Sequence, residues 1–362
     1  MTPMKIAVLS YRLPVAGAKR GGIERVAHGL ADGLARRGHS VVVFSHDPRP
    51  AGALYEVRAL PWKSFVDTWA GLRMTAGYLG NILALQVDLR EFEIVIAHGD
   101  SLLLSMGRKP VVRVMHGSAR GEAVHASSPG RAVLQWGVYL QELLTAFLSP
   151  SAVVAVSANT QRDNPFIRRV IPNGVDTAIF QPLPAGKSAH PSLVFVGSVD
   201  GRKRGRFLLD IFARVVRPVF ADAELTFVGP GGPPQEGVTY VTGVTDTDLA
   251  ALYRHAWALA APSTYEGFGL PYLEAMACGT AVIATPNPGS REVLGEGFGG
   301  LVEDAGFGPA LVRVLADQGW RRSLEVAGLR RAGEFSIDRM IDQYEALLNE
   351  LRGSHARSVV SA

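Results

Sequence analysis

The sequence has a single cysteine, no long apolar run and no internal repeat, and each absence excludes a class of protein. Cys278 alone cannot form an internal disulfide, and with no Cys/His cluster nearby it cannot build a thiolate zinc site. No segment reaches the roughly 18 to 20 uninterrupted apolar residues of a spanning helix, and the amino-terminal stretch lacks the apolar core of a signal peptide. We expect a cytoplasmic protein that meets a membrane, if at all, as a peripheral contact at its inner face.

The composition is that of a folded α/β protein. Apolar residues make up 47% and charged residues 19% of the 362 residues, which is too apolar for disorder. At about 150 residues per domain, the length predicts two domains. Lys and Arg outnumber Asp and Glu by 37 to 33, a balance that fits an anionic ligand, an anionic membrane surface or merely an arginine-rich composition. We expect no nucleic acid partner.

Short apolar runs alternate with amphipathic helical patterns along the first half of the chain. One helix is predicted at residues 22–38, with Ile23, Val26, Ala27, Leu30 and Leu34 on one face. A second is predicted at residues 131–148, which we expect to be a core helix rather than one lying on a membrane. Strands are predicted at residues 5–11, 40–45, 93–99, 110–117 and 152–157. The alternation predicts a parallel sheet covered by helices.

A second alternation follows a proline-punctuated stretch at residues 170–192, which we interpret as the inter-domain linker. The pattern predicts an amino-terminal lobe over residues 1–171 and a carboxy-terminal lobe over residues 172–335. A last helix, with a frayed tail from Ser354, occupies residues 336–362 and is expected to pack back on the amino-terminal lobe. Two doubly wound, Rossmann-like lobes would face a central cleft, where ligands of such folds bind.

The stretch from Pro262 to Leu294 combines two carboxylates with a glycine-rich turn. Gly267 and Gly269 make the turn, and a helix beginning near Pro271 would place Glu274 in its first turn. Free N–H groups at such a turn suit a phosphate. Carboxylates accept hydrogen bonds in pairs, so Glu266 and Glu274 suit vicinal sugar hydroxyls. The alternative is that Glu266 caps the helix and Glu274 complements its dipole.

Two further clusters of charge lie at predicted helix starts. The cations of residues 201–205, GRKRG, oppose the helix dipole, so a bound anion explains them better than a solvated cluster does. Lys19 and Arg20 beside Gly21 and Gly22 favour the same role, with a tight turn as the alternative. Residues 246–248, DTD, imitate a metal motif, but we expect Asp246 to cap a helix there and expect no metal.

Several motifs together resemble retaining glycosyltransferases of family GT4, which have the two-lobed GT-B fold. The stretch EGFGLPYLEAMACGTAVIAT, with its E-x7-E spacing, is similar to the family signature. The family's glycine loop and first helix are similar to residues 21–45. Its interlobe segments are similar to VSANTQRD and VIPNGVDTAIFQP, and its phosphate-binding strand and turn are similar to FVGSVDGRKRG. The motifs occur in the family's order over some 300 residues, which makes the likeness specific.

The resemblance implies a donor site built from these motifs. Glu274 would hold the ribose hydroxyls and Glu266 those of the transferred sugar. Ser198 stands where the family has arginine, so the cation for the diphosphate would come from the GRKRG cluster, where Lys203 matches the family lysine by spacing. His116 would lie near the anomeric carbon, while His98 is interpreted as structural. The other implied donor contacts are Gly21, Gly22, Arg202, Arg204, Val244, Gly267, Phe268, Gly269, Leu270 and Glu292.

The implied activity is transfer of a sugar from a nucleotide-diphosphate sugar, of the UDP or GDP type, to a hydroxyl acceptor with retention of configuration. No metal and no cofactor are implied, and the acceptor is a sugar, a glycolipid or a small metabolite. The alternatives are a GT-B nucleotide-sugar epimerase and a non-catalytic nucleotide-sugar binder. A nicotinamide-dependent oxidoreductase would need a G-x-G-x-x-G loop after the first strand, which is missing there.

Overall fold

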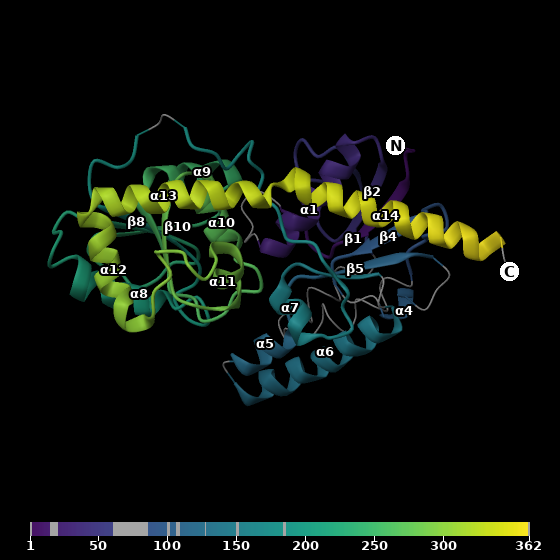
Figure 1. Cartoon of the computed structure of the whole chain (residues 1–362), viewed down its shortest axis with the longest axis horizontal. Helices are drawn as coiled ribbons and strands as arrows, with labels where there is room; N and C mark the ends of the chain where they lie inside the picture. The colour runs from purple at the N-terminus through teal and green to yellow at the C-terminus, as the bar shows by residue number, and fades with distance from the viewer. Residues whose placement is uncertain are drawn as a thin grey trace. The chain divides into compact units, whose positions relative to one another are not determined.

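The structure is a computed structural model that describes residues 2–14, 21–60, 86–99, 102–105, 109–126, 128–149, 152–183 and 186–360. The chain divides into two compact units (Figure 1). The first holds the described residues up to Gly174 together with those from Ile337 onward, and the second holds Val175–Ser336. The division therefore falls three residues after the boundary predicted between residues 171 and 172.

The first unit is built on a parallel sheet with the strand order β3-β2-β1-β4-β5-β6-β7. Its strands are β1 (Lys5–Leu9), β2 (Ser40–Ser45), β3 (Glu56–Ala59), β4 (Ile94–Ala97), β5 (Val111–Met115), β6 (Val153–Ala155) and β7 (Arg169–Val170). Its described helices are α1 (Gly22–Arg36), α4 (Leu102–Ser105), α5 (Ala119–Val124), α6 (Pro129–Leu148), α7 (Ala158–Asp163) and α14 (Ile337–Val360). The predicted strands are all present, whereas β3 and β7 were missed because they are short and only half-buried.

The second unit is built on a parallel sheet with the order β10-β9-β8-β11-β12. Its strands are β8 (Ser192–Val196), β9 (Glu224–Val228), β10 (Val238–Val241), β11 (Ala258–Ala261) and β12 (Ala281–Ala284). Its helices are α8 (Gly205–Ile211), continued by the π-helical η1 (Phe212–Val216), α9 (Asp246–His255), α10 (Leu270–Ala277), α11 (Pro288–Leu294), α12 (Asp304–Ala316), α13 (Gln318–Ala332) and the short 3-10 turn η2 (Gly333–Phe335). Both sheets thus have the Rossmann-like layout expected from the alternating pattern.

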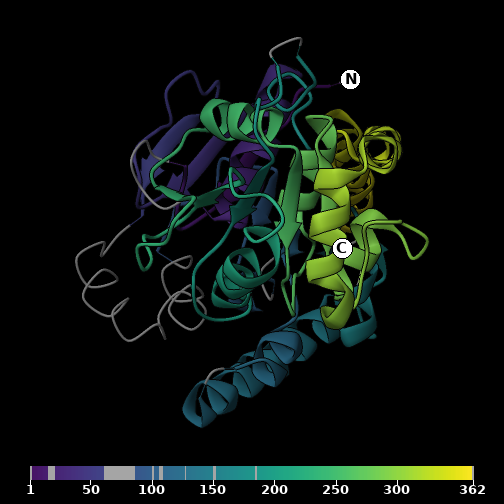
Figure 2. The same cartoon turned by 90° about the vertical axis from the view of Figure 1, so that its left-hand side faces the viewer.

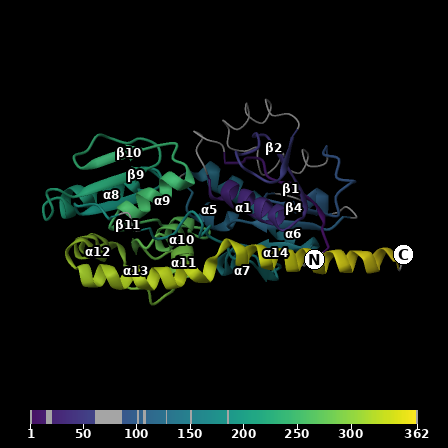
Figure 3. The same ribbon diagram turned by 90° about the horizontal axis from the view of Figure 1, so that it is seen from above.

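The carboxy-terminal helix α14 packs along α1 within the first unit (Figure 3). Gly29 and Gly33 of α1 make room for it, since an added Cβ at Gly33 would lie 2.0 Å from Cδ1 of Ile341. Just after the end of α1, a buried polar contact joins the chain to α14, since Nε2 of His39 lies 3.1 Å from Oε1 of Glu345. The helix extends to Val360, past Ser354, where we predict that the tail begins to fray.

Helix α6 does not have the buried apolar face expected of a core helix. Glu142, Thr145 and Ala146 are its buried residues, Leu134, Val138 and Leu143 are half-buried, and six large apolar side chains are between 46% and 73% exposed. These six lie along one stripe of the helix and are Val133, Trp136, Leu140, Leu144, Phe147 and Leu148. Figures 1 and 2 show α5 lying beside α6. The prediction of a core helix was therefore wrong, because hydrophobic periodicity does not say which side of a helix meets a sheet.

Candidate active site

Glu266 is the centre of a buried ionic group in the second unit. It lies in the turn after β11, and Arg202 and Lys203 lie in the turn after the neighbouring strand β8. Nη1 of Arg202 donates to Oε2 of Glu266 at 2.8 Å, and Nζ of Lys203 donates to Oε1 at 2.5 Å. Glu266 is only 5% exposed. Because parallel strands end at the same edge of a sheet, the two turns meet although Arg202 and Glu266 are 64 residues apart in the chain.

The turn that carries the two cations is fastened to the turn that carries Glu266. The backbone N–H of Thr264 donates to the carbonyl of Arg202 at 2.9 Å, and Nη1 of Arg202 also donates to the carbonyl of Tyr265 at 2.7 Å. Gly197 leaves room for the side chain of Lys203, because a Cβ added at Gly197 would lie 2.9 Å from Cβ of Lys203. The positions of both cations are therefore set by backbone contacts as well as by the carboxylate.

The ionic group keeps a net positive charge. Burial acts to raise the pKa of Glu266, but the charges and hydrogen bonds of Lys203 and Arg202 outweigh it and hold the pKa below its ordinary value. One carboxylate therefore faces two cations, and one positive charge remains. Lys203 and Arg202 are 19% and 37% exposed at their side chains, so this charge can be reached by an anion.

Arg204, the third cation of the cluster, points elsewhere. Its backbone is left-handed, with φ of 56°, at the position before α8. Its guanidinium donates to both carboxylate oxygens of Asp304 at 2.7 and 2.8 Å and lies 4.0 Å from the ring centre of Phe207. The hydrogen bond to Arg204 lowers the pKa of Asp304. The structure thus brings Arg202 and Lys203 together at Glu266 and leaves Arg204 outside the group.

The glycine turn before α10 is held by close backbone approach. Gly269, at φ of +106°, precedes the first helical residue, Leu270. The ring of Phe268 is buried and packs edge-on against Phe335 at 5.8 Å. Gly289, near the start of α11, lies so close that an added Cβ would be 2.6 Å from the carbonyl oxygen of Phe268 and 2.8 Å from that of Glu266. The turn of residues 266–270 therefore packs against both the start of α11 and the 3-10 turn η2.

Glu274 is buried and lies further along α10 than the sequence predicted. It is the fifth residue of α10 and not part of the first turn, so that prediction was wrong. Its side chain is 1% exposed, and Oε2 accepts a hydrogen bond from the hydroxyl of Tyr253 on α9 at 3.1 Å. No sequence pattern links these two residues, which lie 21 positions apart on different helices. Tyr253 is thus a supporting residue that the sequence did not identify.

The remaining predicted contacts of the second unit lie at other helix starts. Val244 precedes α9, whose cap is Thr245 in a reciprocal capping box with Asp248. Asp246 is the first helical residue, so the prediction that it caps the helix was wrong. Glu292 lies on α11, and its carbonyl accepts from Nη2 of Arg331 at 2.8 Å. In the described part of the chain, no three His, Cys, Asp or Glu side chains are grouped so that they could hold a metal ion.

In the first unit, His116 directly follows β5 and His98 directly follows the neighbouring β4. Nδ1 of His98 lies 2.8 Å from Nε2 of His116, and the rings stack at 5.1 Å. Burial lowers the pKa of His116 to about 4, and burial together with the neighbouring His116 holds the pKa of His98 well below its ordinary value. Gly21 is the residue before α1 and Gly22 its first residue, while Lys19 and Arg20 lie outside the described residues.

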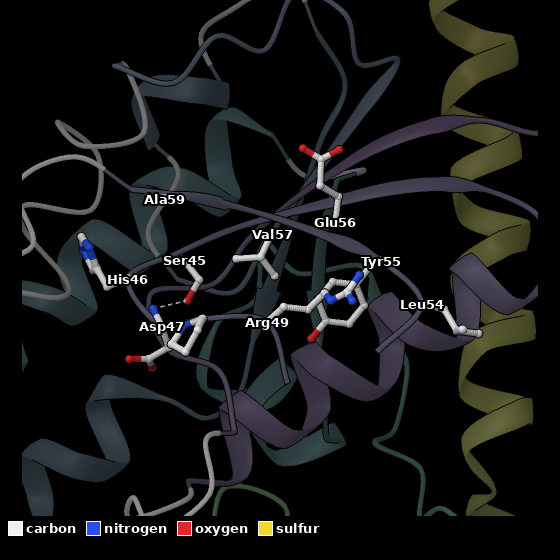
Figure 4. A pocket seen from close by; sticks show the side chains of 10 residues that line it. Ser45, His46, Asp47, Arg49, Leu54, Tyr55, Glu56, Val57 and Ala59 are labelled. Atoms are coloured by element: carbon white, nitrogen blue, oxygen red, sulfur yellow. Dashed lines mark hydrogen bonds between the residues drawn. The ribbon is translucent and has the colours of Figure 1, made fainter. Parts of the chain in front are cut away.

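A surface pocket of about 740 Å³ lies beside β2 and β3 in the first unit (Figure 4). Its polar lining includes His46, Asp47, Arg49 and Glu56. Asp47 is held in place, since its carboxylate accepts from the backbone N–H of Leu13 at 3.0 Å. We predict that residues 47–65, in the amino-terminal lobe, help to form the acceptor side, and this lining includes part of that segment. Residues 61–65 lie outside the described residues.

Comparison with known proteins identifies the family. Residues 20–179 match the model described as Glycosyltransferase Family 4, and residues 190–317 match that described as Glycosyl transferases group 1. Between them, the two matches span most of the chain. The chain belongs to glycosyltransferase family 4. It is an enzyme that transfers a glycosyl group from a nucleotide sugar to a hydroxyl acceptor.

Named relatives of this family 4 transferase act on different acceptors. MMP alpha-(1->4)-mannosyltransferase of Mycolicibacterium hassiacum is 28% identical, over 89% of this chain and 94% of that protein. Phosphatidyl-myo-inositol mannosyltransferase of Propionibacterium freudenreichii is 27% identical, over 75% of each chain. Anabaena HepE, in complex with UDP and glucose, superposes with a TM-score of 0.72 at 19% identity, covering 96% of this chain and 100% of that one. That likeness supports the GT-B fold.

Proposed function

We propose that this transferase moves a hexosyl group from a UDP- or GDP-sugar with retention of configuration, and that the Glu266 group binds the donor. The observation that carries the proposal is the convergence of Arg202 and Lys203 on one buried carboxylate. In the donor complex the two cations would face the diphosphate and Glu266 the hydroxyls of the transferred sugar. Backbone N–H groups of residues 267–270 would add fixed donors, and Glu274 would take the ribose.

The chemistry that follows needs no protein nucleophile. Breaking the bond to the diphosphate places negative charge on the leaving group and positive charge on the anomeric carbon. Arg202 and Lys203 would stabilise the first, and preorganised charges of this kind usually make the largest contribution to such catalysis. We propose same-face attack, in which the departing phosphate accepts the proton of the acceptor hydroxyl. Neither a metal nor a cofactor is then required.

A panel of nucleotides tests the donor class. Thermal unfolding would be followed with UDP, GDP, ADP and TDP and then with their sugar conjugates, because a ligand at 100 times its Kd stabilises the folded state by about 2.7 kcal/mol. We expect one of UDP and GDP to raise Tm and its conjugate to support transfer. Stabilisation by ADP or TDP alone would contradict the donor class. Stabilisation without transfer or hydrolysis would favour a non-catalytic binder, and epimerised donor would favour an epimerase.

The first unit, which we propose binds the acceptor, has a surface that suits a lipid-linked or anionic molecule. The exposed apolar stripe of α6, defined above, runs along a 20-residue helix of about 30 Å. Phe166 extends the stripe, since its ring packs against Phe147 at 5.2 Å, and the exposed Arg162 and Arg168 lie within four residues of Phe166 in the sequence. Apolar side chains bordered by arginines suit the surface of an anionic bilayer, and one relative is named for mannosylating a phosphatidylinositol. We propose peripheral membrane contact through this stripe of α6. Among the described helices, none is long and apolar enough to cross a membrane.

Vesicle co-sedimentation tests this contact. The double variant Leu140→Glu, Phe147→Glu should bind vesicles of phosphatidylcholine and phosphatidylglycerol at least about tenfold more weakly than the wild type, since each lost side chain contributes about 1.5–3 kcal/mol on full burial. Val326→Glu is the matched control, because Val326 is a similarly exposed apolar residue on α13 of the second unit. Equal binding by the double variant and the control would contradict the proposal.

A further inference from the structure

Two histidines occupy equivalent places at the carboxyl edge of the first sheet. Each directly follows its strand, and because β4 and β5 are neighbours, the two rings meet. Their nitrogens are 2.8 Å apart, between Nδ1 of His98 and Nε2 of His116. His98 is 4% exposed, whereas His116 is half-buried. One ring of the pair is therefore enclosed, and the other reaches the surface of this edge.

The contact is a hydrogen bond between two neutral rings. A neutral imidazole carries one proton, so one of its nitrogens donates and the other accepts. The depressed pKa values, caused by burial, leave both rings uncharged at neutral pH. Only two arrangements remain, in which either Nδ1–H of His98 donates to His116 or Nε2–H of His116 donates to His98.

The second nitrogen of His98 decides between them. Nε2 of His98 is buried and has no hydrogen-bond partner among the described residues. If His116 donated, the proton of His98 would sit on this nitrogen as a buried N–H without an acceptor, which folded proteins rarely tolerate. If His98 donates from Nδ1, the same nitrogen is only an unused acceptor, which costs less. His116 then carries its own proton on Nδ1.

We propose that His98 is a positioning residue that holds His116 in the Nδ1-protonated tautomer, so that His116 offers a hydrogen-bond donor, and not a base, to a substrate oxygen. This inference rests on the proposed role of His116 in transfer. It gives His98 a function that the sequence did not reveal, because the sequence suggested a purely structural residue. It also agrees with a reaction in which the acceptor proton goes to the leaving phosphate.

The tautomer can be measured without any substrate. In protein labelled with ¹⁵N-histidine, long-range ¹H–¹⁵N correlation spectra distinguish the two tautomers of each of the nine histidines, and His116→Gln assigns the signals of His116. We expect Nδ1–H in the wild type. Finding Nε2–H there would overturn the proposal. Because no donor or acceptor is present, this result is independent of whether the proposed function holds.

Two variants of His98 separate positioning from packing. His98→Asn keeps an N–H group close to the place of Nδ1, whereas His98→Leu has a similar volume and no polar atom. We expect His98→Leu to lose the Nδ1–H tautomer and to lower kcat at least about tenfold at unchanged donor Kd. His98→Asn should keep the tautomer and recover most of that rate. Equal rates and tautomers in the two variants would overturn the proposal, and inactivity of the wild type would instead count against the proposed function.

Discussion

Replacing Glu266 by glutamine should lower the rate of sugar transfer at least about tenfold, or about 1.4 kcal/mol in transition-state stabilisation, without weakening the binding of the nucleoside diphosphate. The carboxylate holds Arg202 and Lys203 at 2.8 and 2.5 Å and cancels one of their two charges. Glutamine has nearly the same shape and no charge, so both cations become available to the diphosphate. Transfer still falls, because the amide cannot accept hydrogen bonds from two sugar hydroxyls as a carboxylate does.

Lys203→Ala should act differently and lower both transfer and diphosphate affinity. It removes one of the two cations, so the negative charge of Glu266 cancels that of Arg202 and no net positive charge remains for the phosphates. Transfer would be measured as kcat/KM, and diphosphate binding by calorimetry. Arg206→Ala is the matched control, since Arg206 lies at the start of α8, just after the same turn, and pairs with Asp200 in an exposed ion pair worth little. Near-wild-type transfer in both Glu266→Gln and Lys203→Ala would remove this group from the active site.

Gly289→Ala should reduce transfer more than tenfold, although the change adds only one methyl group. The new Cβ would lie 2.6 Å from the carbonyl oxygen of Phe268 and 2.7 Å from Cβ of Glu266, and neither is the free end of a flexible side chain. The start of α11 must then move away from the turn of residues 266–270, and Glu266 moves with it. A displacement of about 1 Å in such a group can cost about a hundredfold in rate.

Gly297→Ala provides the matched control for this prediction. An added Cβ at Gly297 meets nothing within 4 Å, and the residue is exposed in the loop just after the end of α11. We expect this variant to unfold and react like the wild type. If Gly289→Ala kept full activity, the close packing of α11 on the Glu266 turn would have no part in catalysis. A circular dichroism melt would show whether either variant loses stability rather than activity alone.

Much of the fold was predictable because burial imposes a period on the sequence. The strands of both sheets appeared as apolar runs, and α14 showed its buried face through Met340, Ile341 and Tyr344. The prediction failed where a segment is marginal or its surroundings decide. Strand β3, with the sequence EVRA, is half-exposed and has no apolar run. Helix α6 has apolar spacing, yet most of that apolar surface lies on the outside.

The site shows the same division between local and distant information. The sequence alone predicts Glu266, Lys203 and the glycine turn as members of the proposed donor site, because a turn that binds phosphate needs small residues and its neighbours need particular charges. Thr245 rather than Asp246 caps α9, since only one of the two adjacent residues has the extended backbone that a cap requires. A choice between adjacent residues depends on a local dihedral angle that the pattern does not encode.

The sequence by itself determined the family, the two Rossmann-like units and the chemical types gathered at the proposed donor site, because these depend on residue type, spacing and order. Only the tertiary structure decided which groups meet. Arg202 and Lys203 reach Glu266 while Arg204 turns to Asp304, because the neighbouring strands β8 and β11 bring their turns together and the left-handed backbone at Arg204 redirects its side chain. His98 and His116 form a pair because β4 and β5 are adjacent. Contacts between residues far apart in the chain follow from strand order, which no local pattern of residues contains.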